Sequence, residues 1–258
     1  MIAWSLELEY DGTPFVGWQR QGVGPSVQSV LEEAASRLAG GAAVPSFVAG
    51  RTDAGVHASG QVAMLHLPEG FASARLRDAL NFHMKPHPVV VLRAAVAPPG
   101  WNPRFSATGR RYLYRVLNRR PRPALELHRA WHVPYPLDAD AMAEGAAHLL
   151  GRHDFTSFRA SACQARSPLR TLDRLSVTRR GETIEVVAEA RSFLHHQVRN
   201  MVGTLKLVGE GHWPAARVAQ ALAARDRGAA GPTAPPEGLC LTGVRYDPDP
   251  FAATSAGR

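Results

Sequence analysis

The sequence predicts an α+β fold built on an antiparallel sheet. One observation is the spacing of apolar residues. They stand at every second position in segments typical of strands and at every third or fourth position in segments typical of helices. The other is the order of the elements along the chain. Some strands follow one another directly and others are separated by helices, which favours an antiparallel α+β sheet. The first half of the chain reads strand, helix, strand, strand, helix, strand over residues 2–10, 27–38, 46–49, 60–67, 73–82 and 89–96.

The first strand and the first helix carry clear signals. Residues 2–10 place an apolar side chain at every even position, and residues 11–14 follow as a turn. Ser26 is suited to cap the first helix, and the glycine pair at 40–41 is suited to end it. Trp18, in the loop between strand and helix, is either a core aromatic covering that helix or part of a loop that stacks on a nucleotide base or contacts the RNA backbone.

The second half opens with an alternating strand over 110–117, in which Tyr112 and Tyr114 share one face. The basic, proline-rich segment 119–136 cannot be regular structure, and it is either an RNA contact or a surface insertion that touches nothing. The remaining expected elements are a helix capped by Asp138 and running to 150, a compact loop over 153–159, strands over 170–178 and 183–190, a helix that includes 193–203, a helix over 213–225, a mobile Gly/Ala/Pro stretch, a strand over 238–246 and a disordered tail over the last dozen residues.

Composition narrows the function classes. The 258 residues are 45% hydrophobic and contain no apolar run long enough to span a bilayer, and the net charge of +8 fits a polyanionic partner such as nucleic acid. The first nine residues include two acids where a signal peptide needs an unbroken apolar core, so we expect a cytoplasmic protein without a membrane partner. Cys163 and Cys240 are isolated, which favours small buried thiols over a disulfide framework or a zinc site.

One polar loop, residues 49–58, concentrates groups suited to catalysis. It holds a guanidinium, a hydroxyl, a carboxylate and an imidazole within seven residues, with a glycine on either side of the acid. It falls between two segments that read as buried strands, an arrangement in which a rigid scaffold presents reactive side chains. Asp53 would then face outward as a nucleophile or an anionic contact, and a plain Asp-Ala-Gly turn is the structural alternative.

The adjacent His195 and His196 do not predict a metal site. On a helix, neighbouring side chains diverge by about 100°, which is too far for them to chelate one ion together, and no acid or cysteine lies near them in the sequence. The chain also lacks a phosphate-binding loop and a dinucleotide fingerprint. We therefore expect neither a metal nor a cofactor.

The loop sequence GRTDAGVH at residues 50–57 resembles the signature of the tRNA pseudouridine synthase A family. Four further stretches match this family in order and spacing, so the likeness extends from about residue 4 to about residue 246. They are residues 10–12 with 17–21, residues 104–108 running into 111–112, residues 154–158, and residues 198–200 with Gly203.

The resemblance implies two pseudo-symmetric α+β halves, whose antiparallel sheets join into one central sheet flanked by helices, with the active-site cleft between the halves. On this basis we expect an N-terminal half at residues 1–105, a C-terminal half at 106–248 and a tail at 249–258. The resemblance also implies a homodimer in which one tRNA contacts both subunits.

The implied reaction is the isomerisation of uridine to pseudouridine at positions 38, 39 and 40 in the anticodon stem-loop of tRNA. Asp53 matches the family's essential aspartate, acting as a nucleophile or as the base that generates a glycal. Arg199 matches the arginine that pairs with this aspartate, and Tyr112 the tyrosine that lies against the flipped-out uracil. Arg51 is expected to fill the place of the flipped base or to hold a phosphate. For His57 we expect a structural hydrogen bond within the loop rather than catalysis.

The sequence departs from the family near residue 195, and two other functions compete with the family's activity. Where the family often has an arginine and a methionine, this chain has His195 and Gln197, so RNA contacts there are expected to differ. A tRNA-binding protein without turnover would have no need of an anionic Asp53 facing RNA. A hydrolase using Asp53 would need a histidine partner or a second carboxylate, and neither stands at a useful spacing.

Overall fold

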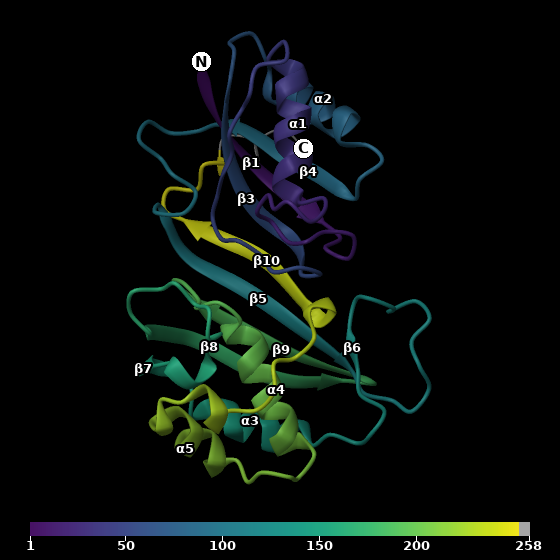
Figure 1. The fold of residues 1–258 in the computed structure, drawn as a ribbon, viewed down its shortest axis with the longest axis vertical. Coiled ribbons are helices and arrows are strands. Elements are labelled where there is room, and N and C mark those ends of the chain that lie inside the picture. Colours follow the sequence, from purple (N-terminus) through teal and green to yellow (C-terminus); the bar gives the residue numbers. More distant parts are fainter. Residues whose placement is uncertain (253–258) are drawn as a thin grey trace. The chain divides into compact units, whose positions relative to one another are not determined.

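The computed structural model describes residues 1–252, and these residues form two compact units (Figure 1). The first unit contains residues 1–109 together with the returning segment 241–252, and the second contains residues 110–240. The described residues include ten strands and five α-helices, which confirms the predicted α+β class. None of the helices in residues 1–252 has the length and apolar content needed to cross a membrane.

The first unit is built on strands in the order β4-β1-β3-β10. The central strand β1 runs antiparallel to β3 and to β4, so that Leu6 lies opposite Ala63 on one side and Ala94 on the other. The antiparallel pairing predicted for this half is thereby confirmed. The strands are β1 Ile2–Tyr10, β3 His57–Leu67, β4 Val89–Val96 and β10 Leu239–Tyr246, with the short β2 Phe47–Val48 pairing with β3.

Helices α1 (Val27–Leu38) and α2 (Ser73–Met84) cover one face of this sheet (Figure 1). The alternation in β1 places Trp4, Leu6 and Leu8 on one face, and none of the three is more than 1% exposed. Ser26 caps α1 as predicted, because its side-chain oxygen accepts a hydrogen bond from the backbone N–H of Ser29. The core of the first unit therefore follows the period-two pattern of its sequence.

The chain's C-terminal segment packs against the first unit. Phe251 is 2% exposed and lies in a cluster with Ala49, Val62 and Ala95, and the Arg93 guanidinium lies over its ring. The expectation of a disordered tail is therefore wrong for residues 247–252. Residues 253–258, the rest of that expected tail, lie outside the described residues.

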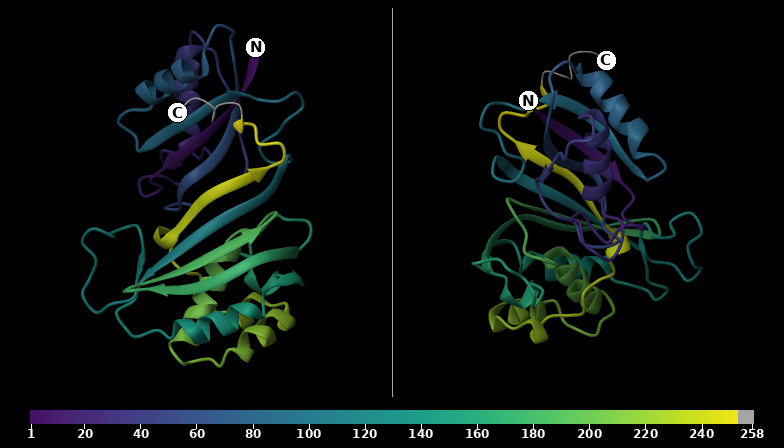
Figure 2. Two further views of the ribbon diagram at one scale, coloured as in Figure 1. Left: turned by 180° about the vertical axis from the view of Figure 1, so that it is seen from behind. Right: turned by 45° about the horizontal axis from the view of Figure 1, so that its top comes forward.

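The second unit is built on strands in the order β5-β9-β8-β7. The pairs β5–β9, β9–β8 and β8–β7 are antiparallel, and only the two-residue β6 pairs in parallel, with β5, among the described residues of this unit. The helices cover one face of the sheet, and the left view of Figure 2 shows β8 and β9 from the other face. The elements are β5 Ala107–Leu117, β6 Trp131–His132, α3 Ala139–Ala147, β7 Gly151–Asp154, β8 Leu169–Arg180, β9 Thr183–Ala190, α4 Gln197–Gly209 and α5 Ala216–Ala224.

Several expected elements differ from the structure. The buried strand expected at 46–49 is only β2, and Phe47 in it is 45% exposed. The expected loop at 153–159 contains the end of β7 and a 3-10 turn. The sequence does not predict β7, because a four-residue strand is too short to show a hydrophobic period. The segment 119–136 contains β6, and α3 ends at Ala147 rather than at 150. Both cysteines are partly exposed rather than buried.

Candidate active site

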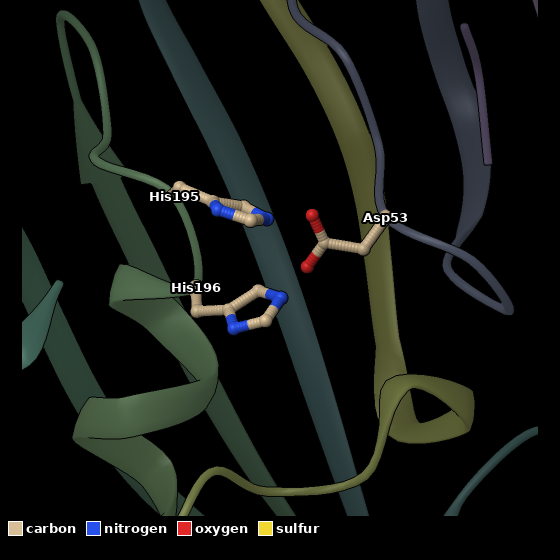
Figure 3. Close-up of side chains that lie close together, drawn as sticks. All are labelled: Asp53, His195 and His196. Carbon is tan, nitrogen blue, oxygen red and sulfur yellow. The ribbon is translucent and has the colours of Figure 1, made fainter. Parts of the chain in front are cut away.

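Asp53 lies on the turn between β2 and β3 in the first unit. Its side chain is half-buried. Figure 3 shows that it projects from the loop. The backbone N–H of Val56 donates to the Asp53 carbonyl at 3.2 Å, and Gly55 closes the turn with a φ of 76°, a conformation that glycine adopts without strain. The neighbouring Arg51 is exposed. The carboxylate and this guanidinium therefore stand on one short, hydrogen-bonded turn.

Thr52 anchors this turn to the core of the first unit. Its carbonyl accepts a hydrogen bond from the Trp18 N–H at 3.0 Å, and its hydroxyl lies 2.8 Å from the Tyr10 hydroxyl. The buried Gln61 side chain donates both to the Gly50 carbonyl and to the Tyr10 hydroxyl. With its flanking residues held in this way, Asp53 has little freedom to move.

Two glycines of the preceding segment lie against the Asp53 turn. A Cβ at Gly12 would be 2.1 Å from the Val56 carbonyl oxygen, and one at Gly17 would be 2.8 Å from the Thr52 carbonyl oxygen. Gly17 also has a φ of 110°, which side chains rarely tolerate. The stretches 10–12 and 17–21, which carry part of the family resemblance, therefore include residues that hold the loop.

Trp18 and His57 support the fold around the Asp53 turn. Trp18 is 1% exposed, so the core interpretation is correct and the base-stacking one is wrong. His57 makes a structural hydrogen bond, in which its Nδ1 accepts from the Gly12 N–H at 3.0 Å. The partner lies outside the loop within which this bond was expected.

Tyr112 and Arg199, the other two predicted site residues, belong to the second unit. Tyr112 is half-buried on β5, and its ring meets Phe193 edge to face with centroids 5.2 Å apart. Arg199 lies in the first turn of α4, where its Nε donates to the Ala234 carbonyl at 2.8 Å. The Ala234 N–H donates in return to the Arg199 carbonyl at 3.1 Å. Asp53 and Arg51 thus lie on one loop of the first unit, and Tyr112 and Arg199 on two elements of the second.

The segment that holds Arg199, residues 226–235, is itself fixed to α4; we call it the strap. The buried Asn200 side chain accepts hydrogen bonds from the Thr233 hydroxyl at 2.7 Å and from Arg227 Nη2 at 3.2 Å. Arg227 Nη1 also donates to the Gly231 carbonyl at 2.8 Å. A Cβ at Gly203 would be 1.8 Å from the Pro232 carbonyl oxygen, so helix and strap are in close contact. The expectation that this stretch is mobile is wrong.

Tyr114 joins the end of the strap to β5. Its hydroxyl donates to the Pro235 carbonyl at 2.8 Å, and its side chain is fully buried. Burial raises the pKa of the Tyr114 phenol well above its ordinary value, with a further contribution from Glu237 and an opposing one from Arg199. Tyr114 therefore keeps its proton and remains a donor. The sequence does not predict these roles of Asn200, Arg227 and Tyr114, because no spacing links the three residues to Arg199.

The structure corrects the assignment of His195 and His196 to a helix. Helix α4 begins at Gln197, and His196 before it has a φ of 62°. The Gln197 side chain accepts a hydrogen bond from the Leu194 N–H at 2.8 Å, which fixes a turn over these residues instead of helix. The two imidazole rings lie side by side with centroids 4.0 Å apart (Figure 3), so the argument from helical divergence does not apply to them.

Comparisons with a family model and with known proteins agree on one family. A family model described as tRNA pseudouridine synthase matches residues 146–247. The tRNA pseudouridine synthase A of Acidiphilium cryptum is 69% identical over 252 residues, covering 97% of this chain and 99% of the relative. The protein of the same name from Paramagnetospirillum magneticum is 62% identical, covering 95% and 96%, and that from Rhodospirillum rubrum is 53% identical, covering 100% and 92%. These likenesses span both units.

Proposed function

Because the chain belongs to the tRNA pseudouridine synthase A family, we propose that it isomerises uridine to pseudouridine at positions 38, 39 and 40 of the tRNA anticodon stem-loop, with Asp53 acting on the flipped-out nucleotide. The observation that carries the proposal is the fixed Asp53 turn. A half-buried carboxylate whose neighbour Thr52 is held at both carbonyl and hydroxyl is preorganised to meet a substrate atom.

The chemistry conserves atoms overall. The bond between uracil N1 and ribose C1′ breaks, the base turns, and a bond forms between uracil C5 and the same ribose carbon. The hydrogen on C5 leaves as a proton and N1 gains one, so nothing is oxidised or hydrolysed. Asp53 serves this sequence either as a nucleophile or as the base that generates a glycal, and both roles use its ionised form.

The other predicted residues take roles around the extruded nucleotide. Tyr112 lies against the uracil, a role supported by its half-buried ring and its edge-to-face contact with Phe193. Arg199 supplies the cation that favours the charged carboxylate, supported by the Ala234 carbonyl that orients its guanidinium. Arg51, exposed on the Asp53 turn, fills the space left by the flipped base or holds a phosphate.

Three unmodified tRNA transcripts, each with its only anticodon-arm uridine at position 38, 39 or 40, test the site of modification. We expect pseudouridine at each of these positions, detected by carbodiimide labelling and reverse transcription. A transcript with cytidine at all three positions is the control. Modification elsewhere, or none on any transcript that the protein binds, would contradict the proposal, and the second result would favour a tRNA-binding protein without turnover.

The family resemblance further supports a cytoplasmic homodimer in which one tRNA contacts both subunits. Light scattering of the purified protein tests this assembly. We expect a mass twice the 27.9 kDa of the chain, whereas the mass of a single chain at micromolar concentration would rule the dimer out.

A further inference from the structure

A cavity of about 220 Å³ on the second unit is lined by three arginines and no acid. It lies where the start of β8 meets β7 and the residues that follow β9. Its lining residues are Arg152, Leu169, Arg170, Thr171, Arg191 and Ser192. Such a concentration of positive charge suggests an anion as the occupant.

Strand register places three of these residues in a row. Arg152 lies opposite Thr171 in the β7–β8 ladder, and Arg191 directly follows the Leu172–Ala190 pair of the β8–β9 ladder. Opposite residues share a face, and adjacent strands are about 4.8 Å apart, so two arginines flank the threonine. We call Arg152, Thr171 and Arg191 the arginine row. All three are exposed, whereas Leu172 and Ala190 are buried, so the row occupies the face that the helices leave open (Figure 2).

The charge of the row is not neutralised within the protein. No carboxylate in residues 1–252 lies within ion-pairing distance of Arg152, Arg170 or Arg191. Other arginines of this sheet do have acidic partners. Arg174 lies 3.5 Å from Glu189, and Arg180 lies 2.9 Å from Glu185.

One acid close to the row in the sequence is engaged by other groups. Asp154, two residues after Arg152, accepts hydrogen bonds from the N–H and hydroxyl of Thr156 and lies 3.7 Å from Arg225. It therefore does not take the place of an external anion at Arg152.

Arg170 adds a third positive charge to the cavity lining. Its Nη1 donates to the carbonyls of Ser167 and Leu169, and its Nε is buried with no hydrogen-bond partner among the described residues. Burial lowers the pKa of Arg170 below its ordinary value, yet a guanidinium stays protonated at neutral pH. The uncompensated charge raises the local positive potential.

We propose that the arginine row binds a phosphodiester group of the tRNA substrate. Two guanidinium forks can each present paired N–H donors to phosphate oxygens, and the Thr171 hydroxyl between them supplies a further donor. The proposal rests on the proposed function, since that function supplies the polyanion.

The position of the row relates it to the base-binding residues of its own unit. Arg191 lies two residues before Phe193, and the Phe193 ring packs on Tyr112. The Cα atoms of Arg191 and Phe193 are therefore at most about 7 Å apart. A phosphate held at Arg191 would therefore fix the tRNA backbone close to the ring assigned to the uracil. The row positions substrate and takes no part in the chemistry.

The test is the salt dependence of tRNA binding by the full-length protein. We expect Arg152→Gln and Arg191→Gln each to raise the Kd for unmodified tRNA about tenfold. Each loss of a phosphate contact should also reduce the slope of log Kd against log salt concentration by about 0.7 to 0.9. The kcat at saturating tRNA should stay within about twofold of wild type, since neither residue touches the reacting atoms.

Two further variants separate charge from other effects. Thr171→Val should raise the Kd a few-fold without changing the salt slope, because it removes a hydrogen bond and no charge. Arg180→Gln, a change at an exposed arginine that pairs with Glu185, should change neither quantity. Matching circular dichroism and thermal midpoints would show that all variants fold.

A wild-type salt slope in both arginine variants would overturn the proposal, as would a fall in kcat without a change in Kd. Binding of inorganic phosphate to the protein is a second measurement. If it binds the cavity while the variants leave tRNA binding unchanged, the row is a site for free anions and not for tRNA. Binding to tRNA does not require turnover, so a wild-type protein that binds tRNA but modifies no uridine would sink the proposed function alone.

Discussion

At the scale of single residues, Gly17 lies against the Asp53 turn where no side chain fits. We expect Gly17→Ala to lower the free energy of unfolding by about 1–3 kcal/mol, because the new Cβ meets the Thr52 carbonyl and the backbone keeps a positive φ. The displaced turn should also lower kcat. Urea unfolding and initial rates measure the two effects.

Gly50→Ala is the matched control for stability. A Cβ at Gly50 has no heavy atom within 4 Å among the described residues, so the unfolding free energy should change by less than about 0.5 kcal/mol. Equal losses in the Gly17 and Gly50 variants would contradict this account of how the turn is held.

Tyr114 gives a pH-dependent prediction. Because burial raises its pKa in the folded protein, the unfolded phenol ionises first, and the stability that Tyr114 contributes is present below pH 10 and lost as pH rises above it. Tyr114→Phe should cost about 1 kcal/mol near pH 8, through the lost hydrogen bond to Pro235, and less near pH 10.5. Urea unfolding at both pH values checks this, and a difference that grows with pH would contradict it.

The loop motif identifies Asp53 and Arg51 as candidates from sequence alone, but not what fixes them. Trp18 and Gly17 act on Thr52 from 34 and 35 positions away in the sequence, a separation that no local pattern can reveal. Trp18 illustrates the same limit, because an aromatic residue in a loop suits a core position and a stacking surface equally well. Its burial decides between them.

At the scale of elements, the strap and the first turn of α4 form the unit that orients Arg199. Arg227→Ala should remove the hydrogen bonds to Gly231 and Asn200 and lower the unfolding free energy by about 1.5–3 kcal/mol. As the Ala234 carbonyl loses its position, kcat should fall more than KM changes. Arg227→Lys should not restore kcat, since an ammonium lacks the planar fork.

Arg180→Ala is the control for the strap. It removes an exposed guanidinium whose partner is Glu185, and the unfolding free energy should change by less than about 0.5 kcal/mol. An Arg227 variant with wild-type kcat and reduced stability would show that the strap supports the fold without orienting Arg199.

Elements with a clear period were predictable, and those set by tertiary contacts were not. Strand β1 and helix α1 appear with the predicted bounds because alternation and a serine cap define them locally. His195 and His196 were assigned to a helix because Leu194 extends the apolar stripe of α4, whereas a turn fixed by Gln197 interrupts it. The Gly, Ala and Pro content of the strap predicts a mobile segment, but hydrogen bonds of Arg227 to Gly231 and Asn200 hold it in place.

At the scale of the whole molecule, the chain returns to the first unit after completing the second. We expect Phe251→Ala to lower the unfolding free energy by about 3 kcal/mol, because it empties a buried site against Ala49, Val62 and Ala95. Deletion of residues 253–258, which leaves this side chain in place, is the control. Equal thermal midpoints for the wild type and the Phe251 variant would contradict the anchoring role.

The α+β class was predictable from the order of periodic segments, whereas the return of the C terminus was not. A single phenylalanine in a short polar segment gives no period, and its burial depends on a cluster contributed by β3, β4 and the residue after β2. The assignment of the family, by contrast, came from contiguous motifs and agrees with the comparisons over nearly the full length of the chain.

Release of tritium from tRNA labelled at uracil C5 shows whether Asp53 drives isomerisation of uridine in tRNA. Forming the new carbon–carbon bond must expel that hydrogen, whereas binding leaves it in place. We expect release by the wild-type protein and none by Asp53→Asn, with tRNA affinity retained in the variant. No release by wild type from bound, unmodified tRNA with uridine at positions 38, 39 and 40, or undiminished release by Asp53→Asn, would contradict this expectation.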